Sequence, residues 1–213
     1  DVHLNISNHT FTVTVIDNEA PALLDMPSEM VVSATEGQCS APVSWTAPTA
    51  SDNCEITDLT SSHENGATFD LGSTLVTYTT TDSSANSTQQ SFLVTVIDDQ
   101  APQFLEAPGD MTLDSSAGLC SAVASWSNPV VSDNCGETTL SVSQQPGTMF
   151  SVGSTFVTMF LSDNSGNSTQ HSFTVTVIDS EAPILSGIPT DMTLSSDLGQ
   201  CGATANWQLP VGT

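Results

Sequence analysis

The chain has 213 residues, enough for two ordinary domains, and 38% of them are hydrophobic, which is enough to form packed cores. It carries 24 acidic residues and no Lys or Arg, which excludes electrostatic binding of nucleic acid and a polybasic membrane contact. It has no run of 18 apolar residues, so we expect no direct membrane contact in this part of the protein.

An internal repeat with a constant 81-residue period organises the sequence. The segment FTVTVID at 11–17 recurs with little change at 92–98 and 173–179. The chain begins within a strand pattern and ends within a motif, so we expect it to be part of a longer protein. We predict the last strands of one module (1–18), two complete modules (19–99 and 100–180) and the start of a further module (181–213). The same offset relates three cysteines, three tryptophans and three asparagines: Cys39, Cys120, Cys201, Trp45, Trp126, Trp207, Asn5, Asn86 and Asn167.

Within each module the sequence patterns predict short β-strands and no helix. Residues 40–45 predict a strand that ends at Trp45, whose side chain we expect in the core. Residues 73–80 are rich in β-branched and aromatic side chains, and 92–98 alternate with a period of two. The turn residues 82–86 between them predict an antiparallel hairpin. We therefore expect an all-β fold, with about seven strands per module in two antiparallel sheets packed as a sandwich.

The cysteines predict disulfide bonds within each module. Cys39 and Cys54 lie close together in the sequence, Cys120 and Cys135 have the same spacing, and the repeat makes the two pairs equivalent. We predict the bonds Cys39–Cys54 and Cys120–Cys135, with the partner of Cys201 lying beyond the end of this sequence. Thiolate-bound zinc is the weaker alternative, because zinc sites space paired cysteines about two to four residues apart. Disulfide bonds indicate an oxidising, extracellular compartment.

Four Asn-x-Ser/Thr sequons predict covalently attached N-glycans at Asn5, Asn86 and Asn167, and a further one at Asn8. The first three occupy one position of the repeat, in the predicted hairpin turn. The alternative is that Asn stands there only because it is a favourable turn residue.

Acidic residues gather where one predicted module meets the next. Carboxylate oxygens are the ligands that calcium prefers, so these residues are candidate calcium ligands, and a solvated acidic linker is the alternative. The dipeptides Asp52-Asn53 and Asp133-Asn134 instead predict turns in which side chains bond to the backbone. No other cofactor is expected. The candidate calcium ligands are Asp17, Glu19, Asp98, Asp99, Asp179 and Glu181.

No pattern of catalytic residues is present. The chain has four histidines, and Gln90 stands in the first complete module where His9 and His171 stand in its neighbours. A catalytic base would not be replaced by Gln in an equivalent unit, so we expect no enzymatic activity.

Several motifs resemble the hyalin repeat family along essentially the whole chain. They are CSAPVSWTAPTASDNC at 39–54, GSTLVTYTTTD at 72–82, and DNSGN at 163–167 followed by FTVTV at 173–177. The resemblance implies tandem immunoglobulin-like β-sandwiches in extracellular adhesion, matrix or coat proteins, without enzymatic activity.

The chain departs from that family at a second cysteine pair, which typically ties the strand after the Ala-Pro joint to the last strand. The corresponding places hold Met26 and Gln90 in one module and Ala107 and His171 in the next. The resemblance therefore implies modules that lack one covalent bond.

Two functions fit these expectations. The first is a structural subunit of an extracellular glycoprotein filament, surface hair, coat or matrix that associates with copies of itself. The second is an adhesion or recognition ectodomain that binds a protein or glycan partner. The loops at 55–70 and 136–150 differ most between modules and are the candidate binding site of the second function.

Overall fold

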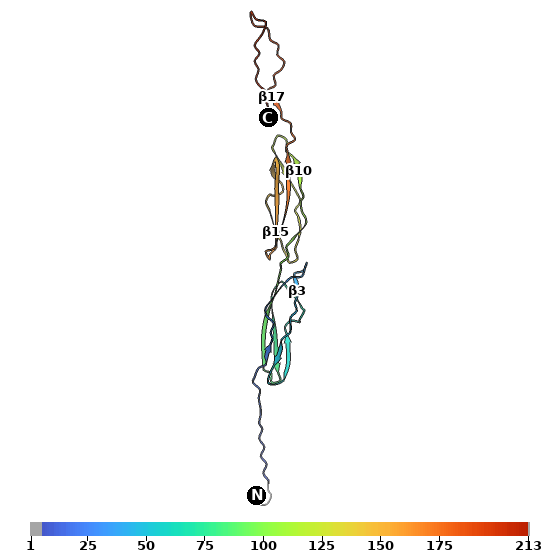
Figure 1. Cartoon of the computed structure of the whole chain (residues 1–213), viewed down its shortest axis with the longest axis vertical. Helices are drawn as coiled ribbons and strands as arrows, with labels where there is room; N and C mark the ends of the chain where they lie inside the picture. Colours follow the sequence, from blue (N-terminus) through green and yellow to red (C-terminus); the bar gives the residue numbers. More distant parts are fainter. Residues whose placement is uncertain (1–5, 213) are drawn as a thin grey trace. The chain divides into compact units, whose positions relative to one another are not determined.

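A computed structural model describes residues 6–212 of the chain. All regular elements among these residues are β-strands (Figure 1). The all-β prediction is confirmed. The described residues include no helix that is long and apolar enough to cross a bilayer.

The chain divides into two compact units. The first comprises Asp1–Leu105, Val131–Leu140 and Phe160–Thr169, and the second comprises Glu106–Val130, Ser141–Met159 and Gln170–Thr213. The first unit thus contains the first complete repeat together with two segments of the second repeat.

The first complete repeat forms one four-stranded sheet and two strand pairs. The sheet has the order β2-β8-β7-β5, and the pairs are β1 with β4 and β3 with β6. The strands are β1 (Ala22–Leu24), β2 (Met30–Ser33), β3 (Ser40–Pro42), β4 (Thr49–Ser51), β5 (Ile56–Ser61), β6 (Thr68–Asp70), β7 (Gly72–Asp82) and β8 (Ser87–Ile97).

The predicted hairpin is confirmed in β7 and β8, which pair antiparallel from Gly72 opposite Val96 to Thr81 opposite Ser87. One pairing differs from the expected antiparallel sheets, because β2 runs parallel to β8. Parallel neighbours need a long crossover connection, and the strands β3 to β7 supply it.

The core follows the alternation of β7 and β8. Val76, Val94 and Val96 are at most 1% exposed, and the residues between them face outward. Trp45 is 8% exposed and confirms the predicted core tryptophan. Its ring meets Phe92 edge-on at a centroid distance of 5.3 Å. Aromatic pairs in this geometry stabilise a core beyond their buried area.

The strand predicted over residues 40–45 is shorter than expected, because β3 ends at Pro42. Beyond it the backbone bonds to a side chain. The Trp45 N–H donates to Asn65 Oδ1 at 2.9 Å, and Asn65 Nδ2 donates to the Trp45 carbonyl at 2.7 Å. Trp45 Nε1 also donates to the Tyr78 hydroxyl at 2.8 Å, which satisfies the buried indole.

The second complete repeat has the same topology, with sheet β10-β16-β15-β13 and pairs β11 with β14 and β12 with β9. Trp126 meets Phe150 and Phe173 edge-on, as Trp45 meets its own neighbours. The strands are β9 (Gln103–Glu106), β10 (Met111–Asp114), β11 (Ser121–Ala124), β12 (Val130–Ser132), β13 (Thr139–Val142), β14 (Thr148–Ser151), β15 (Gly153–Ser162) and β16 (Ser168–Ile178).

The flanking segments carry little regular structure. After residue 180 the described residues form only the pair β17 (Leu185–Ser186) and β18 (Val211–Gly212). No sheet covers Trp207 there, and its side chain is 59% exposed. Described residues 6–18 contain no strand, and the module end expected at 1–18 stays a prediction.

Gly72 begins β7 with φ at +105°, and Gly153 begins β15 with φ at +114°. A side chain at this φ is strained, although no atom lies within 4 Å of the Cβ position at Gly72. We expect Gly72→Ala to lower the free energy of unfolding by about 1–3 kcal/mol. Urea denaturation measures the change. Gly109→Ala is the matched control, since its surroundings are equally open and its φ is ordinary. Equal losses in both variants would contradict the backbone explanation.

Candidate metal centre

Two acidic clusters lie in the first unit, at equivalent positions of the repeat. Among the described residues, ligand atoms of Asp17, Asp52 and Cys54 lie within 4.8 Å of one another, and so do those of Asp98, Asp133 and Asp163. We call these the first and the second cluster. The 81-residue offset relates Asp17 to Asp98 and Asp52 to Asp133, and it also relates Asp82, beside the first cluster, to Asp163.

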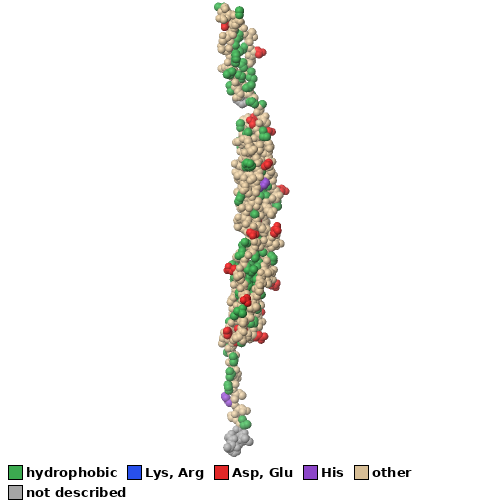
Figure 2. All heavy atoms as spheres, in the orientation of Figure 1, with side chains coloured by type: hydrophobic (Ala, Val, Ile, Leu, Met, Phe, Trp, Pro, Cys, Tyr) green, Lys and Arg blue, Asp and Glu red, His purple; other side chains and the backbone are tan. Residues whose placement is uncertain are grey.

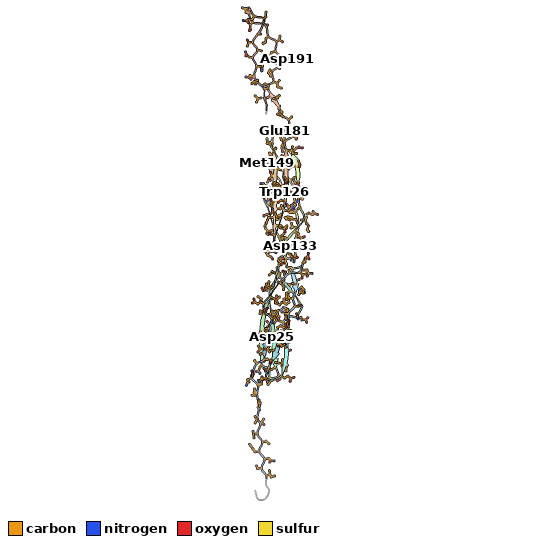
Figure 3. All side chains as sticks on the ribbon, viewed as in Figure 1. Asp25, Trp126, Asp133, Met149, Glu181 and Asp191 are labelled. Carbon is orange, nitrogen blue, oxygen red and sulfur yellow. A yellow bond between two sulfur atoms is a disulfide. The ribbon has the colours of Figure 1, made fainter. Side chains whose placement is uncertain are left out.

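The aspartates of the second cluster each come directly after a strand, at the ends of β8, β12 and β15. Asp133 Oδ2 accepts a hydrogen bond from the Cys135 N–H at 2.8 Å, which confirms the predicted side-chain turn. Asp163 Oδ1 accepts from the N–H groups of Ser165 and Asn167 at 2.9 and 2.8 Å. These turns aim the carboxylates at a common point. Asp133 is labelled in Figure 3.

Two carboxylate oxygens in the second cluster are buried without a hydrogen-bond partner: Asp98 Oδ2 and Asp133 Oδ1. Asp98 is 8% exposed, and its other oxygen, Oδ1, accepts from the Gln100 N–H at 3.1 Å and Asn134 Nδ2 at 3.2 Å. Buried anionic oxygens are costly unless a cation or a donor meets them. The chain supplies no Lys or Arg for this purpose, and the face drawn in Figure 2 accordingly carries no side chain of either kind.

An asparagine side chain donates hydrogen bonds to residues of each cluster. Asn167 Nδ2 donates to Asp163 Oδ2 at 2.8 Å and to the Asp98 carbonyl at 3.1 Å. Burial would raise the pKa of Asp163, but the hydrogen bonds from Asn167 and neighbouring backbone groups outweigh it and hold the pKa below its usual value. The carboxylate is therefore ionised at neutral pH. Asn86 makes the equivalent bonds to Asp82 Oδ2 at 2.8 Å and the Asp17 carbonyl at 3.3 Å.

The first cluster repeats this arrangement with one difference. Asp17 Oδ2 is buried without a hydrogen-bond partner, as Asp98 Oδ2 is. Burial would raise the pKa of Asp82, but hydrogen bonds from Asn86 and Ser84 outweigh it and lower the pKa. The difference is Cys54, a free thiol here. A hydrogen bond to Asp17, then burial, and then the charge of Asp17 raise the pKa of Cys54, so the thiol stays protonated at neutral pH.

Cys39 forms a disulfide bond with Cys135, with the two Cα atoms 4.8 Å apart. The predicted Cys39–Cys54 and Cys120–Cys135 pairs are therefore wrong. The reason is that Cys39 and Cys54 lie at opposite ends of β7. The N–H of Leu71, just before this strand, donates to the Cys39 carbonyl, and Cys54 lies near Asp82 at the other end. A strand of 11 residues spans about 35 Å, far beyond the reach of a disulfide.

Among the described residues, Cys120 and Cys201 are free thiols, as Cys54 is. Cys54 occupies the repeat position of Cys135, and Cys120 that of Cys39. The sequence separation of the observed bond is 96 residues. It equals one full repeat plus the short spacing between Cys39 and Cys54 that first suggested a local pair.

Of the six candidate calcium ligands, only Asp17 and Asp98 lie in the clusters. Asp99 Oδ2 instead accepts a hydrogen bond from Ser33 at 2.6 Å, and Glu181 Oε2 accepts from the Gly118 N–H at 2.7 Å. The backbone N–H of Glu19 donates to Asp17 Oδ1 at 3.1 Å, and Asp179 Oδ1 accepts from the Glu181 N–H at 3.1 Å. Sequence reasoning did not place Asp52, Asp82, Asp133 and Asp163 in or beside these clusters, although their shared offset was a usable signal.

The predicted glycosylation sites differ in their surroundings. Asn5 lies outside the described residues, and Asn8 is exposed. Asn86 and Asn167 are half-buried, and both hydrogens of each amide are donated within an acidic cluster. A glycan on either amide would replace one of these hydrogens. The turn role offered as the alternative thus has a structural basis, and N-glycosylation stays a prediction.

The places of the missing second cysteine pair are filled by other contacts. Met26 packs against the core of the first repeat. In the second repeat, the His171 ring stacks on Phe173 at a centroid distance of 6.4 Å, and its Nε2 lies 2.8 Å from the Pro108 carbonyl oxygen. Packing and hydrogen bonding thus stand where the family's second disulfide would be.

Comparison with known proteins gives one family and several relatives. The family model "HYR domain" matches residues 16–96 and 97–177. Hyalin of Strongylocentrotus purpuratus is 30% identical over an alignment of 221 residues that covers 100% of this chain and 18% of that protein. Hyalin of Lytechinus variegatus is 32% identical over 218 residues, covering 98% of this chain and 41% of that protein. The chain thus spans less than half the length of either hyalin.

Solved structures show weaker similarity. A protocadherin gammaB7 EC3-6 cis-dimer structure covers 81% of this chain and 54% of its own, with 15% identity and a TM-score of 0.38. Drosophila N-cadherin EC1-4 covers 76% of this chain and 50% of its own, with 17% identity and a TM-score of 0.35.

Proposed function

The chain belongs to the HYR domain family, an extracellular class of module, and from this premise we propose that it is a building segment of an extracellular filament, coat or matrix. The coarser role, an extracellular structural or adhesive protein, agrees with the hyalin relatives. The finer role requires that neighbouring repeats transmit force to one another rather than move independently.

The observation that carries this proposal is the Cys39–Cys135 disulfide. It joins a residue of the first repeat to a residue of the second, within one compact unit. Asn134 Nδ2 adds a hydrogen bond to the Gln38 carbonyl at 3.0 Å beside it. A covalent bond here restrains the hinge motion that is otherwise expected between tandem domains.

The repeat extends this bond along the array. Cys120 holds the position of Cys39, so we propose that it pairs with the cysteine 96 residues further on in the parent protein, the separation of the observed bond. By the same reasoning, we propose that Cys54 forms a disulfide bond with a cysteine of the preceding repeat. The partners of this chain are then its own neighbouring repeats and further copies of itself, which a constant stride allows to associate laterally at regular intervals.

A divalent cation, calcium, is part of the proposal, because the buried carboxylates of both clusters lack a cationic partner among the described residues. We propose no catalytic role. The ring nitrogen of His63 lies 2.9 Å from Ser62 Oγ and its ring packs on Phe69, so this histidine has a structural environment.

Electron microscopy of the parent protein in its native material tests the filament role. We expect long, laterally associated filaments that persist in high salt and lose order when a reductant cleaves the disulfides. Isolated monomers under oxidising, calcium-containing conditions would contradict the proposal, and so would filaments whose order survives complete reduction.

A further inference from the structure

We propose that a pocket beside Trp126 binds one sugar ring of a neutral glycan. The pocket lies in the second unit and has a volume of about 280 Å³. Small-molecule pockets usually measure about 300–1,000 Å³, so this one suits a ligand of about one ring. Trp126 is labelled in Figure 3. The inference goes beyond the filament role and does not depend on it.

The pocket exists because a small residue replaces a large one. Ala107 lines it and occupies the repeat position of Met26. Met26 packs against the core of the first repeat, where Trp45 is only 8% exposed. Trp126 lines the pocket and is half-buried instead. The smaller side chain thus leaves the tryptophan ring of the second repeat accessible to a ligand.

The indole N–H of Trp126 is an unused hydrogen-bond donor. In the first repeat, Trp45 Nε1 donates to the Tyr78 hydroxyl, whereas Met159 stands at the position of Tyr78 in the second repeat. Trp126 Nε1 has no acceptor among the described residues, and it is not one of the buried atoms that lack a partner, so it is open to solvent. A ligand that accepts this hydrogen would satisfy it.

Polar side chains complete the lining. Glu106 and Asn128 both line the pocket, are exposed, and make no side-chain hydrogen bond to any described residue. Asn128 stands where the first repeat has Ala47. The carboxylate only accepts hydrogen bonds, whereas the amide donates and accepts. Pro108 and Pro129 add apolar surface beside the tryptophan.

This combination of groups favours a sugar over other ligands. Each sugar hydroxyl donates and accepts, so it can meet both a carboxylate and an indole N–H, while the C–H groups of the ring pack on the tryptophan. A proline-rich peptide offers carbonyl acceptors but few donors for Glu106. A basic side chain offers only donors and would leave Trp126 Nε1 unpaired. The formal net charge of −24 disfavours anionic sugars, so we infer a neutral one.

Nuclear magnetic resonance of the whole, oxidised, isotope-labelled chain tests the inference. The three tryptophans give separate indole N–H signals, and Trp126→Phe identifies that of Trp126 by its loss. The probes are methyl glycosides of neutral hexoses and N-acetylhexosamines. For at least one of them we expect a saturable shift of the Trp126 signal, with a dissociation constant on the order of 1 mM and no shift at Trp45 or Trp207. A glucuronide, a proline-rich peptide and arginine amide should leave the Trp126 signal unchanged.

Three variants connect the binding to the pocket. Ala107→Met restores the residue type of the first repeat, should fill the pocket and should weaken binding at least tenfold. Asn128→Ala removes one hydrogen-bonding side chain and should weaken binding about fivefold. Met149→Ala is the matched control, because Met149 is 65% exposed in the same unit and does not line the pocket. It should bind like the unmodified chain. Circular dichroism reports whether each variant folds.

Several outcomes would overturn the inference. Absence of a saturable Trp126 shift with every glycoside is one, and unchanged binding in folded Ala107→Met or Asn128→Ala is another. A shift with the peptide or with arginine amide, but with no sugar, would assign the pocket to a protein partner instead. None of these results bears on the filament role, which depends on the Cys39–Cys135 bond and on electron microscopy.

Two sources could supply such a sugar, a glycan attached to another copy of this protein or a glycan of different origin. Glycans released from the native parent protein distinguish them. If they shift the Trp126 signal, the ligand is carried by the protein itself. If they do not, while a methyl glycoside does, the ligand comes from elsewhere. Either result agrees with the inferred site.

Discussion

Replacing Cys135 with Ser is expected to lower the free energy of unfolding of the first unit by about 4 kcal/mol under oxidising conditions. The bond spans 96 residues, and closing a loop of that size removes about 4–5 kcal/mol of conformational entropy from the unfolded chain. Cys39→Ser should have the same effect, because each substitution removes the same bond. Guanidinium denaturation without reductant, followed by tryptophan fluorescence, measures the change.

Cys54→Ser is the matched control, since Cys54 is a free thiol in the described structure and should contribute little to stability. If Cys54→Ser destabilised the protein as much as Cys39→Ser while Cys135→Ser did not, the bond would lie within one repeat. The joint would then have no covalent restraint.

Trp45→Ala should cost about 4 kcal/mol in the free energy of unfolding of the first unit. Truncation of a buried tryptophan leaves a cavity, which typically costs about 3–5 kcal/mol. The ring packs against Phe69 and Phe92, so two aromatic contacts are lost with it. The hydroxyl of Tyr78, which is 5% exposed, also loses its donor. Thermal and urea unfolding, followed by circular dichroism, would measure the loss.

Val31→Ala supplies the control for this prediction. Val31 lies in β2 of the same repeat, yet it is 66% exposed, so its truncation should change stability by less than about 0.5 kcal/mol. A loss below about 1 kcal/mol for Trp45→Ala would contradict the central place of the tryptophan in the core.

Much of the fold could be predicted from the sequence because it depends on local patterns. The period-two alternation of β8 and the turn at 82–86 specify the hairpin, and Trp45 is the largest apolar side chain near it. The parallel pairing of β2 with β8 could not be predicted in this way. It is fixed by packing between segments that lie far apart in the sequence, since Met30 stands opposite Val94, and neither strand carries a local signal for it.

The disulfide pairing could not be predicted because the repeat allows two patterns of bonds, one within each repeat and one between neighbouring repeats. A cysteine at the position of Cys39 lies a short distance before one candidate partner, Cys54, and 96 residues before the next, Cys135, and spacing alone favours the nearer. Only the three-dimensional length of β7 separates Cys39 from Cys54. The acidic clusters could not be predicted for a similar reason. Asp133 and Asp163 are each typical turn residues in the sequence, and only the fold brings their side chains together.

The chemistry of the joint therefore depends on positions that are unremarkable one at a time. Asp98, Asn134 and Cys135 together provide a buried carboxylate, a hydrogen bond and a covalent bond within one compact unit. A chain without basic residues cannot neutralise such a site by itself. In the proposed function, an external cation supplies the charge that this unusual composition lacks.

The most direct measurement is the connectivity of the disulfides, by mass spectrometry of unreduced peptides. Trypsin cannot be used because the chain lacks Lys and Arg. Proteases specific for Glu and Asp cut at Glu36, Asp52 and Asp133 and so place Cys39, Cys54 and Cys135 on separate peptides. We predict one cross-linked species that joins the Cys39 and Cys135 peptides and disappears on reduction. A species that joins the Cys39 and Cys54 peptides instead would contradict the covalently restrained joint.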